Sequence, residues 1–426
     1  MLGLLREAGH TVVSDIDDAE GVLINTCGFI TDAAQEGVDT ILHYADLKDK
    51  GHIKTLVVAG CLVQRYGSDI TEEIPQIDVL MGTGDYGRIV EAFARAEAGE
   101  HTSFIGEPGW LAPEGAARVI STPRHYAYIK VSEGCSNRCS YCMIPSLRGP
   151  QKSRPIEAIV QEARRLAEYG VVEAILVAQD TTAYGRDLYG KPGLAHLLRE
   201  VCRVDGLEWI RVLYTYPSLI DDRLIEVLAT EHKILPYLDI PMQHGSDAIL
   251  KAMRRRIDRQ AMIDVCSKLR QAIPDLVIRT SLIVGFPGER DCDFDDLLSF
   301  IREVKPQRAG VFMFSAEEGA HAAGLPDQVD ATVAAERRGL AMEALATISH
   351  EFGQGRVGSV QRVLIDGPSE ESELVCVGRS YAEAPDVDGV VYVGDASLEA
   401  GRFVDVRITD ANDYDIAGEP LEDPIG

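Results

Sequence analysis

Apolar and polar residues follow each other along most of the chain in the order expected when strands and helices alternate. Residues 2–9 have a helical pattern that ends at Gly9, and a second helical pattern ends near Tyr44. Three short apolar runs are interpreted as strands, at 11–14, 22–25 and 55–59. Alternating strands and helices are typical of parallel sheets covered by helices. The pattern predicts a doubly wound α/β domain over residues 1–100, whose first strand is missing because the chain begins inside a helix.

Residues 101–124 lose this periodicity and gain Gly and Pro, so they are expected to form a linker. Six strands then alternate with helices over residues 125–350, which predicts an open, partial (β/α)6 barrel with the loops after its strands at one rim. The six strands are expected at 126–131, 174–178, 209–214, 237–240, 277–284 and 310–314. A helix over 331–352 leads into a small all-β barrel over residues 351–422. Its strands are expected at 359–366, 374–378, 390–393 and 403–409.

The chain has 426 residues, enough for two or three domains, and its apolar runs are too short to span a membrane. It carries 42 Lys and Arg against 68 Asp and Glu, a net charge of −26. From Glu351 onward there are five Arg, no Lys and 17 Asp or Glu. Proteins that hold nucleic acid usually present a basic face, so this balance disfavours RNA and favours a basic protein partner. Nine cysteines, an odd number with three clustered, fit a reducing, cytoplasmic location.

Three of the cysteines, Cys135, Cys139 and Cys142, lie within one short loop at a C-x3-C-x2-C spacing. Three thiolates on one loop can hold a four-iron cluster and leave one iron without a protein ligand. The alternatives are a zinc knuckle or unligated thiols. Zinc usually takes four protein ligands in paired spacings, however, and the chain has no second C-x2-C pair. The spacing therefore favours an iron–sulfur cluster whose open iron carries the chemistry.

Two further cysteines, Cys27 and Cys61, each follow the carboxyl end of an apolar strand. That edge is where open α/β sheets bind their ligands. Two ligands are too few for a stable cluster, and ordinary buried thiols are the alternative interpretation. The remaining cysteines have no ligand spacing and are given no role: Cys202, Cys266, Cys292 and Cys376.

The cysteine loop, with an aromatic residue directly before its last cysteine, resembles the signature of radical S-adenosylmethionine enzymes. The resemblance implies a 4Fe-4S cluster on the three cysteines, whose open iron binds S-adenosylmethionine and cleaves it to a 5'-deoxyadenosyl radical. Loops after the barrel strands are expected to complete the cofactor site. The expected cofactor contacts are Tyr141, Gln179, Asp180, Arg279, Gly285, Gly288 and Glu289. His244, after the fourth strand, is expected to be hydrogen-bonded scaffold rather than a catalyst.

Over nearly its whole length the chain resembles the methylthiotransferases. Residues 25–30 and 59–61 are similar to the second and third cysteine motifs of their N-terminal domain. The resemblance implies that Cys27 and Cys61 bind an auxiliary 4Fe-4S cluster. It also implies that the family's first cysteine, which would be the third ligand, is missing with the first strand, and that Met1 is a misassigned or truncated start. The terminal barrel resembles the TRAM domain. The branch most similar to the chain is the RimO family, which modifies ribosomal protein uS12, on the stretches 122–130, 179–185, 235–241 and 378–389.

Membership of that branch implies that two molecules of S-adenosylmethionine are used. One methylates sulfur at the auxiliary cluster, and the other gives the radical that removes hydrogen from the β-carbon of an aspartate in uS12. The implied partners are uS12, free or in the small ribosomal subunit, and an electron donor such as flavodoxin or ferredoxin. The alternatives are an enzyme acting on adenosine in tRNA, disfavoured by the acidic terminal barrel, and a non-catalytic uS12-binding protein with one cluster.

Overall fold

The computed structural model describes residues 1–421, and its contacts divide the chain into two compact units. The first unit comprises Met1–Val119, Ser132–Arg154 and Ser315–Gly324. The second comprises Ile120–Val131, Pro155–Phe314 and residues 325–421. The cysteine loop therefore belongs to the unit that contains the N-terminal domain.

A four-stranded parallel sheet forms the centre of the first unit. Its strands, in spatial order, are β1 (Gly21–Thr26), β2 (Thr55–Gly60), β3 (Val79–Met81) and β4 (Thr102–Phe104). Its helices are α1 (Leu2–Glu7), α2 (Thr31–Asp49), α3 (Cys61–Glu73) and α4 (Ile89–Glu97). On β2, Val57 and Ala59 pack with residues of α1 and α4, while Leu56 and Val58 pack with residues of α2 and α3. Because side chains alternate across a strand, both faces of the sheet are covered, which confirms the doubly wound α/β class.

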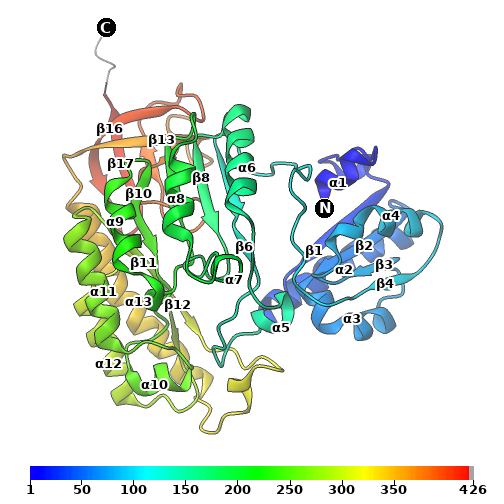
Figure 1. The fold of residues 1–426 in the computed structure, drawn as a ribbon, viewed down its shortest axis with the longest axis horizontal. Coiled ribbons are helices and arrows are strands. Elements are labelled where there is room, and N and C mark those ends of the chain that lie inside the picture. Colours follow the sequence, from blue (N-terminus) through cyan, green and yellow to red (C-terminus); the bar gives the residue numbers. More distant parts are fainter. Residues whose placement is uncertain (422–426) are drawn as a thin grey trace. The chain divides into compact units, whose positions relative to one another are not determined.

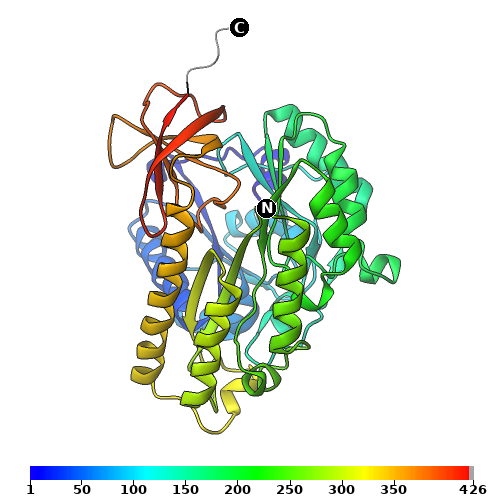
Figure 2. The same ribbon diagram turned by 90° about the vertical axis from the view of Figure 1, so that its left-hand side faces the viewer.

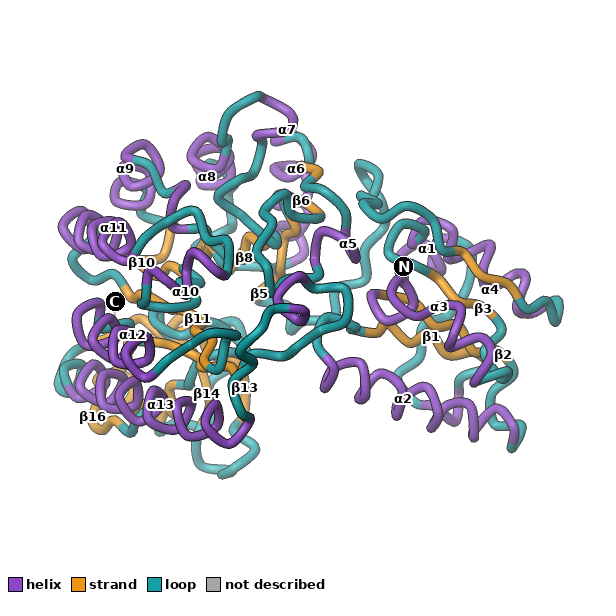
Figure 3. The backbone as a smooth tube through the Cα atoms, turned by 90° about the horizontal axis from the view of Figure 1, so that it is seen from below, coloured by secondary structure: helices purple, strands orange, loops and turns teal. Residues whose placement is uncertain are grey.

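A six-stranded parallel sheet forms the centre of the second unit (Figure 1). Its strands, in spatial order, are β12 (Arg308–Met313), β11 (Val277–Val284), β10 (Ile234–Asp239), β9 (Trp209–Val212), β8 (Glu173–Val177) and β5 (Tyr126–Lys130). Figure 3 shows the helices as an arc outside these strands. They are α6 (Ile156–Tyr169), α8 (Leu194–Cys202), α9 (Asp222–Thr230), α11 (Arg259–Ala272), α12 (Asp291–Val304) and α13 (Ala331–Gln354). The order runs from β12 to β5 without closing, which confirms the open, partial (β/α)6 barrel.

A closed five-stranded barrel follows α13 and lies at the C-terminal end of that helix (Figure 2). Its strands are β13 (Val360–Pro368), β14 (Cys376–Arg379), β15 (Val391–Val393), β16 (Phe403–Ala411) and β17 (Ile416–Pro420). This small barrel packs on the larger sheet, where the Trp209 and Phe403 rings meet at a centroid distance of 4.8 Å. The fully buried Glu173 of β8 accepts from the guanidinium groups of Arg211 on β9 and Arg379 on β14.

Shorter elements complete the chain. They are β6 (Ser132–Glu133), β7 (Lys152–Ser153), α5 (Ile144–Arg148), α7 (Arg186–Tyr189) and α10 (Asp247–Ala252), with 3-10 turns at Ile16–Asp18, Tyr86–Arg88, Pro217–Leu219 and His321–Gly324.

Three expectations about the elements differ from the structure. Residues 11–14 are described and form no strand, because the polar turn Ile16–Asp18 intervenes and the sheet begins at Gly21. The expected linker 101–124 contains β4, whose three residues are too few to show a strand pattern. Neither β3 nor β17 was expected, and residue 422, the last of the expected small barrel, lies outside the described residues.

Candidate iron–sulfur and cofactor sites

The cysteine loop runs between β6 and α5 and is fixed at its first residues. Gly134 has a φ of +77°, and a Cβ atom there would lie 2.4 Å from the carbonyl oxygen of Gly149. That same oxygen accepts a hydrogen bond of 3.1 Å from the backbone N–H of Cys135. The loop therefore starts in contact with the chain that follows α5, a conformation that only glycine adopts without strain.

The three loop cysteines offer the donor chemistry that an iron–sulfur cluster needs. Cys135 is buried, whereas Cys139 and Cys142 are partly exposed, and a 3.2 Å bond from the Cys142 N–H to the Cys139 carbonyl turns the loop. None of the chain's nine cysteines, all within residues 1–421, forms a disulfide. In the same residues no three His, Cys, Asp or Glu side chains converge as the ligands of a single metal ion do. Three thiols on one loop instead fit an iron–sulfur cluster, because each thiolate binds a different iron of the cluster.

Cys27 and Cys61 lie side by side at the carboxyl edge of the first sheet. Thr26 and Gly60 are paired in the parallel register of β1 and β2, and each cysteine is the next residue along its strand. Cys27 is exposed and Cys61 is 4% exposed. Burial raises the pKa of the Cys61 thiol, against the opposing pull of a neighbouring arginine. The edge of the sheet thus carries two neighbouring thiols, of which Cys27 is accessible and Cys61 is buried.

That arginine is Arg148, the last residue of α5. Its Nε donates a hydrogen bond of 3.1 Å to Cys61 Sγ, and its Nη1 lies 3.5 Å from Glu133 Oε1. Cys61 also packs in an apolar cluster with Met143 and Leu147, both from the segment that follows the last loop cysteine. Sequence reasoning missed Arg148, because its position six residues after Cys142 does not indicate that it reaches a cysteine 87 residues earlier.

A second contact missed in the sequence holds the helices that follow Cys27 and Cys61. Glu317, 2% exposed, accepts from the backbone N–H of Thr31 at 2.8 Å, at the start of α2. The other carboxylate oxygen accepts from Arg65 of α3 at 2.8 Å, and Arg65 also donates to the Gly28 carbonyl at 3.1 Å. Burial opposes the ionised form of Glu317, but Ser315, Arg65 and Thr31 together hold its pKa below the usual range. Glu317, in the segment Ser315–Gly324, thus joins the start of α2 to α3 beside the two cysteines.

The cofactor contacts expected in the second unit occupy loops after its strands, except Arg279, which lies on β11 itself. Asp180, 2% exposed, accepts from the Thr182 hydroxyl at 2.7 Å and from the Ala183 N–H at 3.0 Å, so it shapes the loop that also carries Gln179. Arg279 pairs with Asp239 at 3.0 Å and approaches Asp388 at 3.6 Å.

The loop after β11 contains two glycines with different surroundings, since Gly285 is closely packed and Gly288 faces open space. Both have positive φ, but a Cβ on Gly285 would lie 2.6 Å from Ala334 Cβ, whereas one on Gly288 would meet nothing within 4 Å. Glu289 is 5% exposed and accepts from Arg337 at 2.9 Å. His244, fully buried, accepts at Nδ1 from the Ser246 N–H at 2.9 Å, as expected of scaffold. Tyr141 belongs to the first unit, where it is part of the cysteine loop.

Three family models match the chain. The Radical SAM superfamily matches residues 129–301, the TRAM domain matches 357–421, and the Uncharacterized protein family UPF0004 matches 1–82. The ribosomal protein uS12 methylthiotransferase RimO of Trichlorobacter lovleyi is 46% identical over 99% of this chain and 94% of its own length. The chain belongs to the RimO family of methylthiotransferases. RimO of Geobacter sulfurreducens is also 46% identical, over 98% of this chain and 94% of that protein.

Membership of the RimO family makes this chain a radical S-adenosylmethionine enzyme with a 4Fe-4S cluster. Among solved structures, the radical S-adenosylmethionine methyltransferase TsrM of Kitasatospora setae, with tryptophan and a cofactor analogue bound, has a TM-score of 0.57 at 14% identity, covering 78% of each chain. This likeness supports the fold. Within residues 1–421, every helix is too short or too polar to span a bilayer.

Proposed function

We propose that this enzyme transfers a methylthio group to the β-carbon of an aspartate in ribosomal protein uS12, in the cytoplasm. The observation that carries the proposal is the match of 46% over 99% of the chain to a uS12 methylthiotransferase, combined with a complete C-x3-C-x2-C loop. The acidic terminal barrel, with five Arg against 17 Asp and Glu from Glu351 onward, suits a basic ribosomal protein and not tRNA.

Cys135, Cys139 and Cys142 would hold the 4Fe-4S cluster, which together with S-adenosylmethionine supplies a radical able to remove a hydrogen atom from carbon. The chain's own residues hold and enclose the reactants. In the second unit, Gln179, Asp180, Arg279, Gly285, Gly288 and Glu289 are proposed to line the cofactor site, with Tyr141 from the cysteine loop. Gly288 supports this role, because the space beside its Cα is open.

Cys27 and Cys61 would hold a second 4Fe-4S cluster, which would carry the sulfur to be transferred. Their adjacent positions after paired strand residues support this role, since ligands of one cluster must converge. Two thiolates need a further ligand to hold a cluster. An electron donor such as flavodoxin or ferredoxin is proposed to supply the reducing electron.

The proposal is tested in cells that lack the enzyme, by measuring the intact mass of uS12 after complementation. The chain is expected to restore the mass increment of one methylthio group, and Cys142→Ala to abolish it. Cys292→Ala is the matched control, because that thiol is exposed on α12 and has no place in the proposed site. If uS12 stays unmodified while tRNA gains methylthioadenosine, the proposed substrate is wrong.

A further inference from the structure

Arg148 connects the two cysteine sites of the first unit. It ends α5, the short helix that follows the C-x3-C-x2-C loop, and its Nε lies 3.1 Å from the sulfur of Cys61. A guanidinium cannot lose its charge in a protein, so the sulfur of Cys61 faces a permanent cation with a hydrogen-bond donor. This donor comes from the helix that follows the loop of one proposed cluster, and it is directed at a ligand of the other.

The surroundings of this contact are dry. Cys61 is 4% exposed, and the apolar side chains of Met143, Leu147 and Ala320 pack with it. The Arg148 side chain is 19% exposed, and the side chain of Glu133, whose carboxylate lies 3.5 Å from the guanidinium, is 6% exposed. A charged hydrogen bond is worth more in such surroundings than in water, because no solvent competes for the donor.

A second donor lies close to the same sulfur without a hydrogen-bond acceptor of its own. Tyr86, 9% exposed, has a buried hydroxyl that meets no partner among the described residues. Its ring lies 6.0 Å from the Arg148 guanidinium carbon, and its hydroxyl is close enough to Cys61 and Arg148 to interact electrostatically with both. A buried phenol usually has a hydrogen-bond partner, so this one is available to an acceptor that binds beside Cys61.

We propose that Arg148 is a positioning residue of the auxiliary cluster, which orients the Cys61 sulfur and raises the reduction potential of the cluster bound there, with Tyr86 as a supporting donor. The inference rests on the proposed second cluster. Hydrogen bonds to ligand sulfurs and nearby positive charge stabilise the reduced, more negative state of a cluster. Arg148 belongs to the helix after Cys142. A shift of the cysteine loop would therefore change the hydrogen bond from Arg148 to Cys61 and, with it, the reduction potential of the auxiliary cluster.

The alternative is that Arg148 only forms an ion pair with Glu133 and stabilises the fold. If Arg148 tunes the cluster, replacing Arg148 and replacing Glu133 affect the reduction potential differently. If Arg148 only stabilises the fold, breaking the ion pair from either side has the same effect on the potential. Arg148→Gln removes a positive charge and the donor, so the auxiliary cluster becomes harder to reduce. Glu133→Gln removes a negative charge while the contact to Cys61 remains, so reduction becomes easier or stays unchanged.

The test uses the full chain with Cys135, Cys139 and Cys142 all replaced by Ala, so that the remaining iron reports the auxiliary cluster alone. The midpoint potential is measured by redox titration followed by electron paramagnetic resonance. We expect Arg148→Gln to shift the reduction equilibrium at least tenfold toward the oxidised state, which is about 59 mV for a one-electron couple. Arg148→Lys, which keeps the charge and changes the donor geometry, is expected to shift it less, and it replaces Arg148→Gln if that variant does not fold.

An unchanged potential in both Arg148 variants, or equal shifts of the same sign for Arg148→Gln and Glu133→Gln, overturns the inference. Absence of iron and sulfide from the parent chain without the three loop cysteines overturns both the second cluster and this role. The uS12 mass measurement is independent of either result, so a failure of the proposed substrate is distinguishable from a failure at Arg148.

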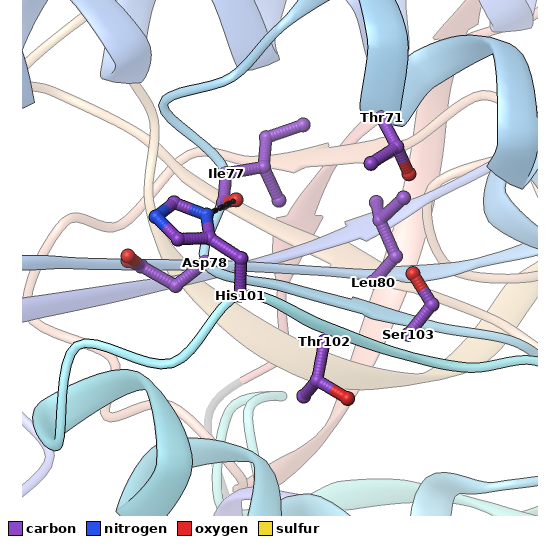
Figure 4. A pocket seen from close by; sticks show the side chains of 7 residues that line it. All are labelled: Thr71, Ile77, Asp78, Leu80, His101, Thr102 and Ser103. Carbon is purple, nitrogen blue, oxygen red and sulfur yellow. Dashed lines mark hydrogen bonds between the residues drawn. The ribbon is translucent and has the colours of Figure 1, made fainter.

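The hollow drawn in Figure 4 is unrelated to this site. It lies at the amino ends of β3 and β4, opposite the edge that carries Cys27 and Cys61, and its His101 is hydrogen-bonded to the Ile77 carbonyl at 3.0 Å. Asp78 in its wall is already engaged by Lys48 and by the Leu56 N–H, at 2.5 Å and 2.7 Å. The hollow is therefore framed by residues that hold the sheet together.

Discussion

Replacing Glu383 by glutamine should lower the stability of the second unit in a manner that depends on pH. Glu383 is fully buried; one carboxylate oxygen accepts from Arg308 at 2.9 Å and Arg356 at 2.6 Å, and the other accepts from the Ser380 hydroxyl at 2.6 Å. Arg308 begins β12, whereas Ser380 follows β14 of the small barrel. The carboxylate thus joins the small barrel to the larger sheet.

The magnitude follows from the pKa of this carboxyl group. Burial raises its pKa, but Arg356, Arg308 and Ser380 outweigh burial and lower it from 4.5 to about 2. These two pKa values differ by about 2.5, and each pKa unit corresponds to about 1.4 kcal/mol, so the ionised group contributes roughly 3 kcal/mol. Because the pKa is lower in the folded state, this contribution is complete above pH 4.5 and is lost as the pH falls toward 2.

Glu383→Gln keeps the shape of the side chain and removes its charge. We expect the variant to unfold with a free energy about 3 kcal/mol lower than the parent at pH 7, and the difference to shrink steadily below pH 4.5. The assay is urea unfolding at several pH values in a Trp110→Phe background, followed by the fluorescence of Trp209 beside Phe403. Glu399→Gln, at an exposed residue of the small barrel, is the matched control. A difference below about 1 kcal/mol at pH 7, or one that is equal at pH 7 and pH 3, would refute the reasoning.

Three further substitutions test the site. Gly134→Ala should reduce the iron bound on reconstitution, since its Cβ would lie 2.4 Å from the Gly149 oxygen; iron content equal to the parent would contradict this. Glu317→Ala should destabilise the first unit by roughly 3 to 5 kcal/mol, because the buried Arg65 loses its carboxylate partner, as measured by chemical unfolding followed through Trp110. Gly288→Ala should weaken S-adenosylmethionine binding in a calorimetric titration while Gly285→Ala mainly lowers stability, and the reverse outcome would place the cofactor elsewhere.

Much of the fold could be predicted because most long elements carry a clear period. The strand Val277–Val284 was predicted at its observed bounds, and the helix from Ala331 was predicted to within two residues. The missed strands β3, β4, β6 and β7 have only two or three residues, fewer than a period-two pattern needs, and β17 has five. Their place in the sheets is decided by pairing with neighbours rather than by their own sequence.

The site was predictable where its residues are adjacent in the chain and unpredictable where they meet through the fold. The spacing of the three loop cysteines is visible in the sequence. The pairing of β1 with β2 explains why Cys27 and Cys61 lie next to each other. Arg148 and Glu317 carry no local signal, because each acts on residues brought near by packing over long sequence separations. The partners of Arg279 show the same limit, since nothing in the sequence indicates that this proposed cofactor contact also pairs with Asp239 and approaches Asp388.

The most direct test of the central claim incubates the purified, iron-reconstituted chain with uS12 from cells lacking the enzyme, S-adenosylmethionine and a chemical reductant. Tandem mass spectrometry of uS12 then locates any added group. We predict one methylthio group on the β-carbon of one aspartate, and none with Cys142→Ala. Cleavage of S-adenosylmethionine without any change in uS12, while added tRNA becomes methylthiolated, would contradict the account.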